Sequence, residues 1–273
     1  MIFNQYEGAV AHSKLFASQN TPHIQANVGL IIFAATFELF NPSSFQGANF
    51  IEGIGQIGLF ISCALYYRKK NDEAIIVAAL SIGIIFSQAW MTMANHSWLT
   101  LWLLFPLAVS KILKLEFDLI NYARLTLAIV MFFAALQKLV SGNYVDGSFL
   151  SYLGQNGSLT ERFFLLPCLA SSNVNCAALV LVSWVSVCWQ FTIAILLFSG
   201  KAGKLIVMIE LLFFFIVALV TDELNFLIIN LAALNLYYRF FDVERFTYVF
   251  FGVLFIDYFT INQIWYVVNE ILA

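Results

Sequence analysis

The chain has 273 residues, of which 62% are hydrophobic and only 11% charged, and its formal net charge is −3. Its mean hydropathy is +0.86. A soluble domain carries roughly twice this share of charged residues, so the composition excludes an ordinary soluble fold. The slightly acidic balance argues against nucleic acid as a partner. The surplus apolar surface indicates that the lipid bilayer surrounds one membrane domain.

Long apolar runs, separated by charged residues, predict an all-α, polytopic membrane helix bundle, because a spanning helix needs about 20 mostly apolar residues. The predicted domains are a cytoplasmic N-terminal segment, 1–26, and a transmembrane domain, 27–273. About nine transmembrane helices fit the second domain, and an eight-span version with an interfacial C-terminal segment is the alternative. The expected spans are roughly 27–40, 49–67, 73–93, 97–110, 119–139, 176–198, 205–221, 224–239 and 246–268.

The basic residues predict the orientation of these spans. With the N-terminus inside, only two of the 13 Lys and Arg residues, Lys138 and Arg162, fall toward the outside. Cytoplasmic loops carry an excess of Lys and Arg, so this distribution favours an N-in topology. The stretch 140–175, which is rich in Gly, Ser and Asn, then becomes an outer loop.

The four cysteines show no CxxC pair and no spacing typical of a metal site. No metal site is therefore predicted. Cys168 and Cys176 flank the final turn of the predicted outer loop, in an oxidising compartment where disulfides persist. A short-loop disulfide between them and two free thiols are both compatible with this position.

Ionisable residues inside spans are costly and usually mark function or buried pairing. For any one of them alone, a structural role is favoured. Glu210, for example, lies about one turn from Lys204 and is interpreted as a carboxylate that reaches the inner aqueous face. The candidates are Glu38, Glu52, His96, Lys138, Glu210 and Asp257.

Lys138 differs from the other candidates because it ends the apolar run 125–136 on the side where positive charge is otherwise avoided. Partial burial favours the neutral amine, which can act as a general base. His96 also falls at an outer span end, between Asn95 and Ser97. The topology therefore predicts a chemical site near the outer face, with His96 and Lys138 at the same depth.

Two segments resemble a known family. The first is Asn-His-Ser-Trp-Leu at 95–99, followed by Leu-Trp-Leu-Leu at 101–104. The second is Phe-Ala-Ala-Leu-Gln-Lys-Leu at 133–139, followed by Tyr-Val-Asp-Gly at 144–147 and Tyr-Leu at 152–153. Both are similar, in the same order, to motifs of vitamin K-dependent γ-carboxylases and their bacterial relatives, the HTTM (horizontally transferred transmembrane) family.

The resemblance implies roles for particular residues. In the carboxylases, the lysine that matches Lys138 deprotonates vitamin K hydroquinone, and the histidine that matches His96 also acts in the site. By this resemblance, Lys138 is the general base and His96 assists it. Asn95 and Asp146 are supporting residues at most. Glu210 is a further predicted supporting residue, at a position where family members commonly have a histidine nearby. A quinone or hydroquinone cofactor and a location in a bacterial cytoplasmic (inner) membrane are implied in the same way.

Three functions stay open at this point. The first is a quinone- or lipid-linked enzyme with carboxylase-like lyase chemistry, which modifies a secreted substrate at the outer face. The second is a non-enzymatic membrane partner in the maturation or export of a secreted peptide or protein. The predicted partners are a secreted peptide or a membrane or periplasmic protein. The third, a transporter, is least favoured, because no inverted repeat or matched pair of broken spans is visible in the sequence.

Overall fold

The computed structural model describes residues 22–39, 50–89, 95–156, 176–221, 224–239 and 243. The chain divides into two compact units, Met1–Ala123 with Ile228–Ala273 (unit 1) and Arg124–Leu227 (unit 2). The boundaries of these units fall within two helices, α6 (Leu119–Ser141) and α11 (Leu224–Tyr238).

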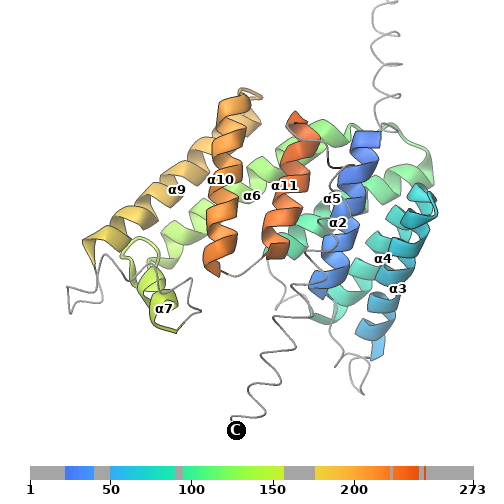
Figure 1. The fold of residues 1–273 in the computed structure, drawn as a ribbon, viewed down its shortest axis with the longest axis horizontal. Coiled ribbons are helices and arrows are strands. Elements are labelled where there is room, and N and C mark those ends of the chain that lie inside the picture. Colours follow the sequence, from blue (N-terminus) through green and yellow to red (C-terminus); the bar gives the residue numbers. More distant parts are fainter. Residues whose placement is uncertain are drawn as a thin grey trace, which may run out of the picture. The chain divides into compact units, whose positions relative to one another are not determined.

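Every regular element among the described residues is an α-helix (Figure 1). These helices are α2 (Pro22–Leu39), α3 (Phe50–Tyr67), α4 (Asn71–Ala89), α5 (Asn95–Leu113), α6 (Leu119–Ser141), α7 (Ser148–Asn156), α9 (Ala177–Phe198), α10 (Lys204–Thr221) and α11 (Leu224–Tyr238). The all-α prediction is thus confirmed for this part of the chain. Eight predicted spans coincide with helices, whereas the ninth, 246–268, lies outside the described residues, as do Asp257 and Arg162.

The predicted count of nine spans is higher than the structure supports. Within the described ranges, four helices are long and apolar enough to cross a membrane, namely α3, α4, α6 and α9. The apolar stretches of α5 and α11, Ser97–Leu113 and Asn225–Tyr238, are shorter. The chain is therefore a multi-pass integral membrane protein. One further difference is α7, a short helix inside the predicted outer loop.

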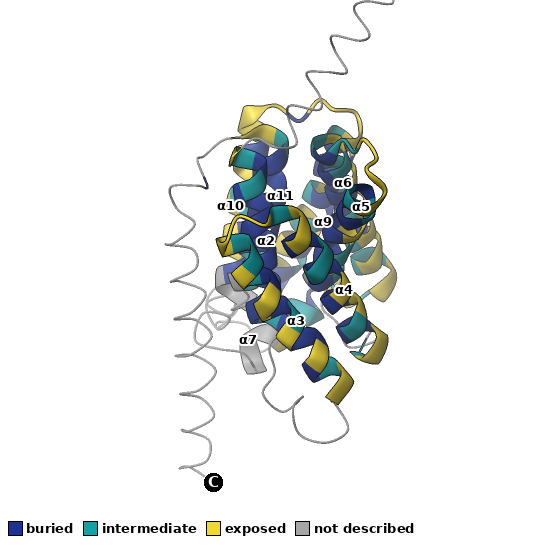
Figure 2. Cartoon of the chain, turned by 90° about the vertical axis from the view of Figure 1, so that its right-hand side faces the viewer, coloured by how far each residue is buried: buried dark blue, intermediate teal, exposed yellow. Residues whose placement is uncertain are grey.

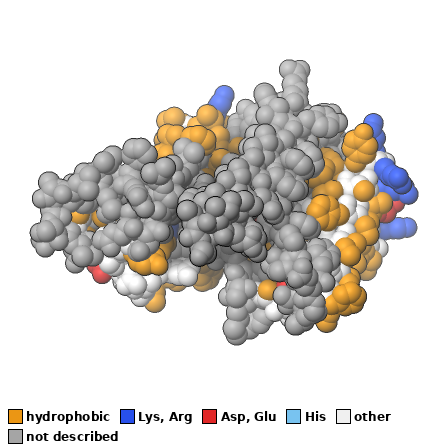
Figure 3. Space-filling view, turned by 60° about the horizontal axis from the view of Figure 1, so that its bottom comes forward, with side chains coloured by type: hydrophobic (Ala, Val, Ile, Leu, Met, Phe, Trp, Pro, Cys, Tyr) orange, Lys and Arg blue, Asp and Glu red, His pale blue; other side chains and the backbone are white. Residues whose placement is uncertain are grey.

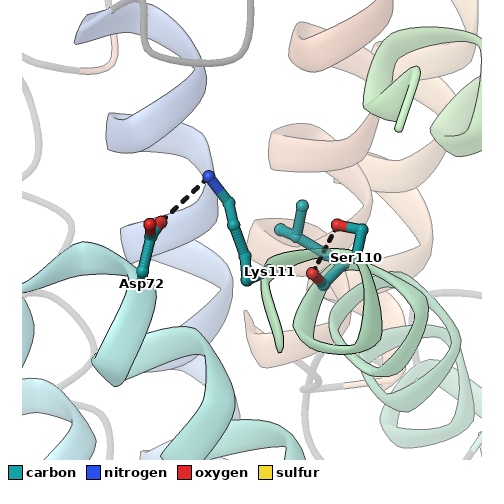
Figure 4. A network of polar contacts seen from close by, with 4 residues as sticks. Asp72, Ser110 and Lys111 are labelled. Carbon is teal, nitrogen blue, oxygen red and sulfur yellow. Dashed lines mark hydrogen bonds and ion pairs between the residues drawn. The ribbon is translucent and has the colours of Figure 1, made fainter. Parts of the chain in front are cut away.

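Contacts within unit 1 place several predicted cytoplasmic connections at one end. The Tyr66 hydroxyl donates to the Gln25 carbonyl at 3.0 Å, which joins the end of α3 to the start of α2. The Lys111 amine pairs with the Asp72 carboxylate at 2.9 Å, which joins the end of α5 to the start of α4 (Figure 4). Helices that alternate in direction require this arrangement.

Polar contacts extend the same arrangement to α11. A His23 ring nitrogen lies 3.0 Å from the Asn235 carbonyl, and the Asn235 amide donates to Asn27 Oδ1 at 3.2 Å. A contact within unit 2 joins a helix start to a helix end in the same way. Arg124, near the start of α6, donates to the Phe198 carbonyl at the end of α9 at 3.0 Å. The alternation of the helices agrees with the charge pattern, and the cytoplasmic side remains a prediction.

The outward faces of several helices are apolar. On α3, for example, Phe50, Ile54 and Phe60 are exposed. Figure 2 shows exposed residues along α3 on the side opposite its buried face. Figure 3 shows hydrophobic side chains over much of the described surface, with the basic ones near its margins. These faces suit acyl chains, so lipid bilayer contact follows.

The close packing of α3 against α4 depends on glycine. A Cβ added at Gly55 would lie 2.8 Å from the Ser81 carbonyl oxygen and 2.6 Å from the Ile85 side chain. The carbonyl belongs to the backbone of α4, so the two helices would have to separate. Gly83, by contrast, faces open space.

We predict that Gly55→Ala lowers the free energy of unfolding by about 1–3 kcal/mol, because the added methyl group overpacks the α3–α4 contact. Gly83→Ala is the matched control, and it is expected to be neutral or to stabilise α4 by about 0.5–1 kcal/mol. Thermal unfolding of both variants in detergent measures the difference. Equal stability of the two variants would contradict the packing described here.

Candidate functional site

Lys138 lies one turn before the end of α6 and is half-buried. Its amine donates a hydrogen bond to Gln190 Oε1 at 2.9 Å. Gln190 stands well inside α9 and is 6% exposed. The Lys138 nitrogen also lies 5.2 Å from the centroid of the Tyr144 ring, within the range of a cation–π contact. The Lys138 amine therefore lies against the middle of α9, well beyond the first turn of that helix.

The turn after α6 brings Tyr144 back over Lys138. Gly142 and Gly147 both have a positive φ, 71° and 78°, which glycine adopts readily. Within the turn, the Val145 N–H donates to the Gly142 carbonyl at 3.0 Å. The Tyr144 ring stacks on Phe149 of α7 at a centroid distance of 4.2 Å. In the segment 144–147, the turn thus explains the glycine, and the ring stacking explains the aromatic residue.

Asp146 caps α7. Its Oδ1 atom accepts the backbone N–H of Ser148 at 2.8 Å, and this side chain is exposed. Hydrogen bonds from the Ser148 side chain and backbone hold the pKa of the Asp146 carboxyl below its usual value. This contact gives Asp146 the role of a cap for α7.

Glu210 lies in α10 and is completely buried, with an exposed fraction of 0%. The indole N–H of Trp189 donates to Glu210 Oε2 at 2.5 Å, whereas Oε1 has no hydrogen-bond partner in the described part of the chain. The charges of Glu210 and Lys138 interact electrostatically. The interpretation of Glu210 as a carboxylate that reaches the aqueous face is therefore wrong, because tertiary packing encloses it beside α9.

A cavity of about 440 Å³ lies beside this cluster, within unit 2. Its walls come from α9, α10, α7 and the turn before α7, and they are mostly apolar. Lys138, Tyr144, Ser183 and Trp189 contribute its principal polar groups. This volume falls in the range of small-molecule sites, and a few placed polar groups in an apolar wall are typical of such sites.

The rim of the cavity merges with the apolar outer surface of unit 2. Val182 and Val185 of α9, and Ile209 and Leu212 of α10, line the cavity and are also exposed. A hydrophobic molecule could thus pass from acyl chains into the cavity without crossing water. The cavity suits a lipid-soluble ligand.

The remaining predicted site residues are Asn95, His96, Cys168 and Cys176. Asn95 and His96 begin α5, in unit 1, and their side chains lie outside the described residues. The pairing of His96 with Lys138 therefore stays a prediction. Cys176 is disulfide-bonded, and Cys168 lies outside the described residues, so their pairing also stays a prediction.

Sequence reasoning missed several polar residues of α9, among them Ser183, Trp189 and Gln190. It searched spans for ionisable groups only, and these side chains are neutral. A usable signal was nevertheless present, because Ser183 and Gln190 are seven residues apart, a spacing that places them on one helix face.

No protein-family model, curated protein or solved structure matches this chain. The resemblance to the carboxylases and the HTTM family therefore stays a prediction. The contacts and the cavity within unit 2 describe the site independently of that resemblance.

The contact of α7 with α9 depends on Gly147. A Cβ at Gly147 would lie 3.0 Å from the Val180 backbone nitrogen, whereas one at Gly142 would meet nothing within 4 Å. Both substitutions to alanine carry the cost of a left-handed backbone, about 1–2 kcal/mol. Gly147→Ala should in addition separate α7 from α9 and open the cavity wall.

We therefore predict faster amide hydrogen exchange over α7 in Gly147→Ala than in Gly142→Ala, at equal temperature and pH. Mass spectrometry of peptides from residues 148–156 gives this readout. Identical exchange in the two variants would mean that α7 does not depend on its contact with Val180.

Proposed function

We propose that this membrane protein is an enzyme that binds a hydrophobic substrate or cofactor in the cavity of unit 2 and uses Lys138 as a general base. The observation that carries the proposal is the place of the Lys138 amine, on the wall of an apolar cavity large enough for a ligand. A lysine is costly in such surroundings, and a chemical role accounts for its presence.

The proposed step is a proton transfer. An acidic O–H group of the bound molecule gives its proton to the Lys138 nitrogen, which leaves a ligand oxyanion beside the new ammonium group. Gln190 Oε1 accepts a hydrogen bond from this nitrogen and so holds it in place.

A hydroquinone fits these residues, as the family resemblance implies. Its ring and any prenyl chain would contact the apolar walls from α9 and α10, and one of its oxygens would face Lys138. A quinol supplies an acidic hydroxyl group and, on oxidation, reducing equivalents. We further propose that the enzyme belongs to the HTTM family and modifies a secreted substrate.

A coloured phenol tests the base directly. We predict that an alkyl-substituted nitrophenol, bound by the protein in detergent, ionises at a pH where it stays neutral in empty micelles. The absorbance of the nitrophenolate measures the transfer of its proton. Lys138→Met should abolish this absorbance, because methionine keeps most of the side-chain volume but cannot accept the proton.

Lys201→Met is the matched control, because Lys201 belongs to the same unit but is exposed in the connection before α10. Quenching of tryptophan fluorescence, to which Trp189 in the cavity wall contributes, reports whether each variant still binds the phenol. Equal ionisation in Lys138→Met and Lys201→Met would refute the general base. In the source organism, Lys138→Ala should abolish modification of the secreted substrate at unchanged protein level.

A further inference from the structure

Helix α9 carries a row of polar side chains, two of which line the cavity. Ser183, Ser186 and Gln190 are spaced at i, i+3 and i+7, which places them on one face of the helix. Ser183 and Ser186 line the cavity, and Gln190 holds the Lys138 amine. The rest of the wall contributed by α9 is mainly apolar, so this row defines where a ligand can form hydrogen bonds.

Ser183 is the unusual member of the row. Its side chain is 2% exposed, and its hydroxyl has no hydrogen-bond partner among the residues that the structure describes. A serine inside a helix commonly donates to a carbonyl one turn back, as Thr192 does to the Cys188 carbonyl at 2.8 Å. Buried polar groups are almost always paired, so an unpaired hydroxyl beside a cavity points to a partner on the bound molecule.

The other polar end of the cavity is the Lys138 amine. An ammonium group has three N–H donors. One donates to Gln190, and the ring of Tyr144 covers a further part of the group. Capacity remains for one acceptor from a ligand. After the proposed proton transfer, that acceptor is the ligand oxyanion.

The spacing along α9 sets the distance between these two ends. Seven residues separate Ser183 from Gln190, which corresponds to about 10 Å along the helix axis at a rise of ~1.5 Å per residue. A small ligand with one polar group satisfies only one end and leaves the other unpaired. An elongated ligand with a polar group at each end satisfies both.

We propose that the cavity takes an elongated amphiphile with an anionic oxygen at Lys138, a hydroxyl or carbonyl group at Ser183, and an apolar body of about 10 Å between them. Ser183 thereby determines which hydrophobic molecules are accepted. The inference rests on the proposed function, because it assumes that this cavity is the binding site, and it adds the class of ligand.

Two fatty acids of equal length test the second polar contact, decanoate and ω-hydroxydecanoate. Binding of each to the purified protein in detergent is measured by tryptophan fluorescence, and the ratio of the two dissociation constants is compared between variants. Partition of the acids into micelles is the same for all variants and so cancels. Ser183→Ala should fold normally, because the hydroxyl that it removes has no partner within the described ranges.

In Ser183→Ala, the preference for the hydroxylated acid should fall about tenfold, because its terminal hydroxyl is then buried without a partner. Thr192→Val is the matched control, since the exposed hydroxyl of Thr192 bonds within its own helix, and its ratio should equal that of the wild type. Lys138→Met should weaken both acids alike and leave the ratio unchanged.

The outcomes separate the two proposals. An unchanged ratio in Ser183→Ala, with both acids weakened by Lys138→Met, would overturn the two-ended ligand and leave the proposed site intact. Undiminished binding of decanoate to Lys138→Met would overturn the site itself. Failure of both acids to bind the wild-type protein would overturn the class of ligand proposed here.

Discussion

The hydrogen bond from the Lys138 amine to Gln190 Oε1 ties the end of α6 to the interior of α9. An amine in apolar surroundings needs such a partner, because an unpaired polar group there costs several times the net gain of an ordinary hydrogen bond. The contact places the Tyr144 ring and α7 over the same part of α9. This polar contact therefore brings together the walls of the cavity in unit 2.

The buried carboxylate of Glu210 adds a second constraint on the same unit. A charged group enclosed by apolar helices is stabilised only by hydrogen bonds and by opposite charge. Trp189 supplies the hydrogen bond, and in the proposed proton transfer Lys138 gains the opposite charge. Polar groups from α6, α9 and α10 thus depend on one another.

Several features of this protein could be predicted from its sequence, because they follow from local patterns. Apolar runs of sufficient length give helices in any apolar solvent, so the helix positions were largely correct. Lys138 stood out because a lysine at the end of an apolar run is costly. Two local features were missed: the short helix α7 and the number of helices that are long enough to span the membrane. Both depend on where helices begin and end, and these ends are set by contacts such as that of Asp146 with Ser148.

An all-α, multi-pass membrane protein with a candidate base at Lys138 follows from local sequence patterns. Composition and hydrophobic patterning are sufficient for that, because the bilayer imposes the same requirement on every span. The burial of Glu210 beside Trp189, and the hydrogen bond from the Lys138 amine to Gln190, appear only in the folded structure. That structure also places the unpaired hydroxyl of Ser183 beside the cavity. These contacts join residues far apart in the chain, and no local pattern specifies which helix faces meet.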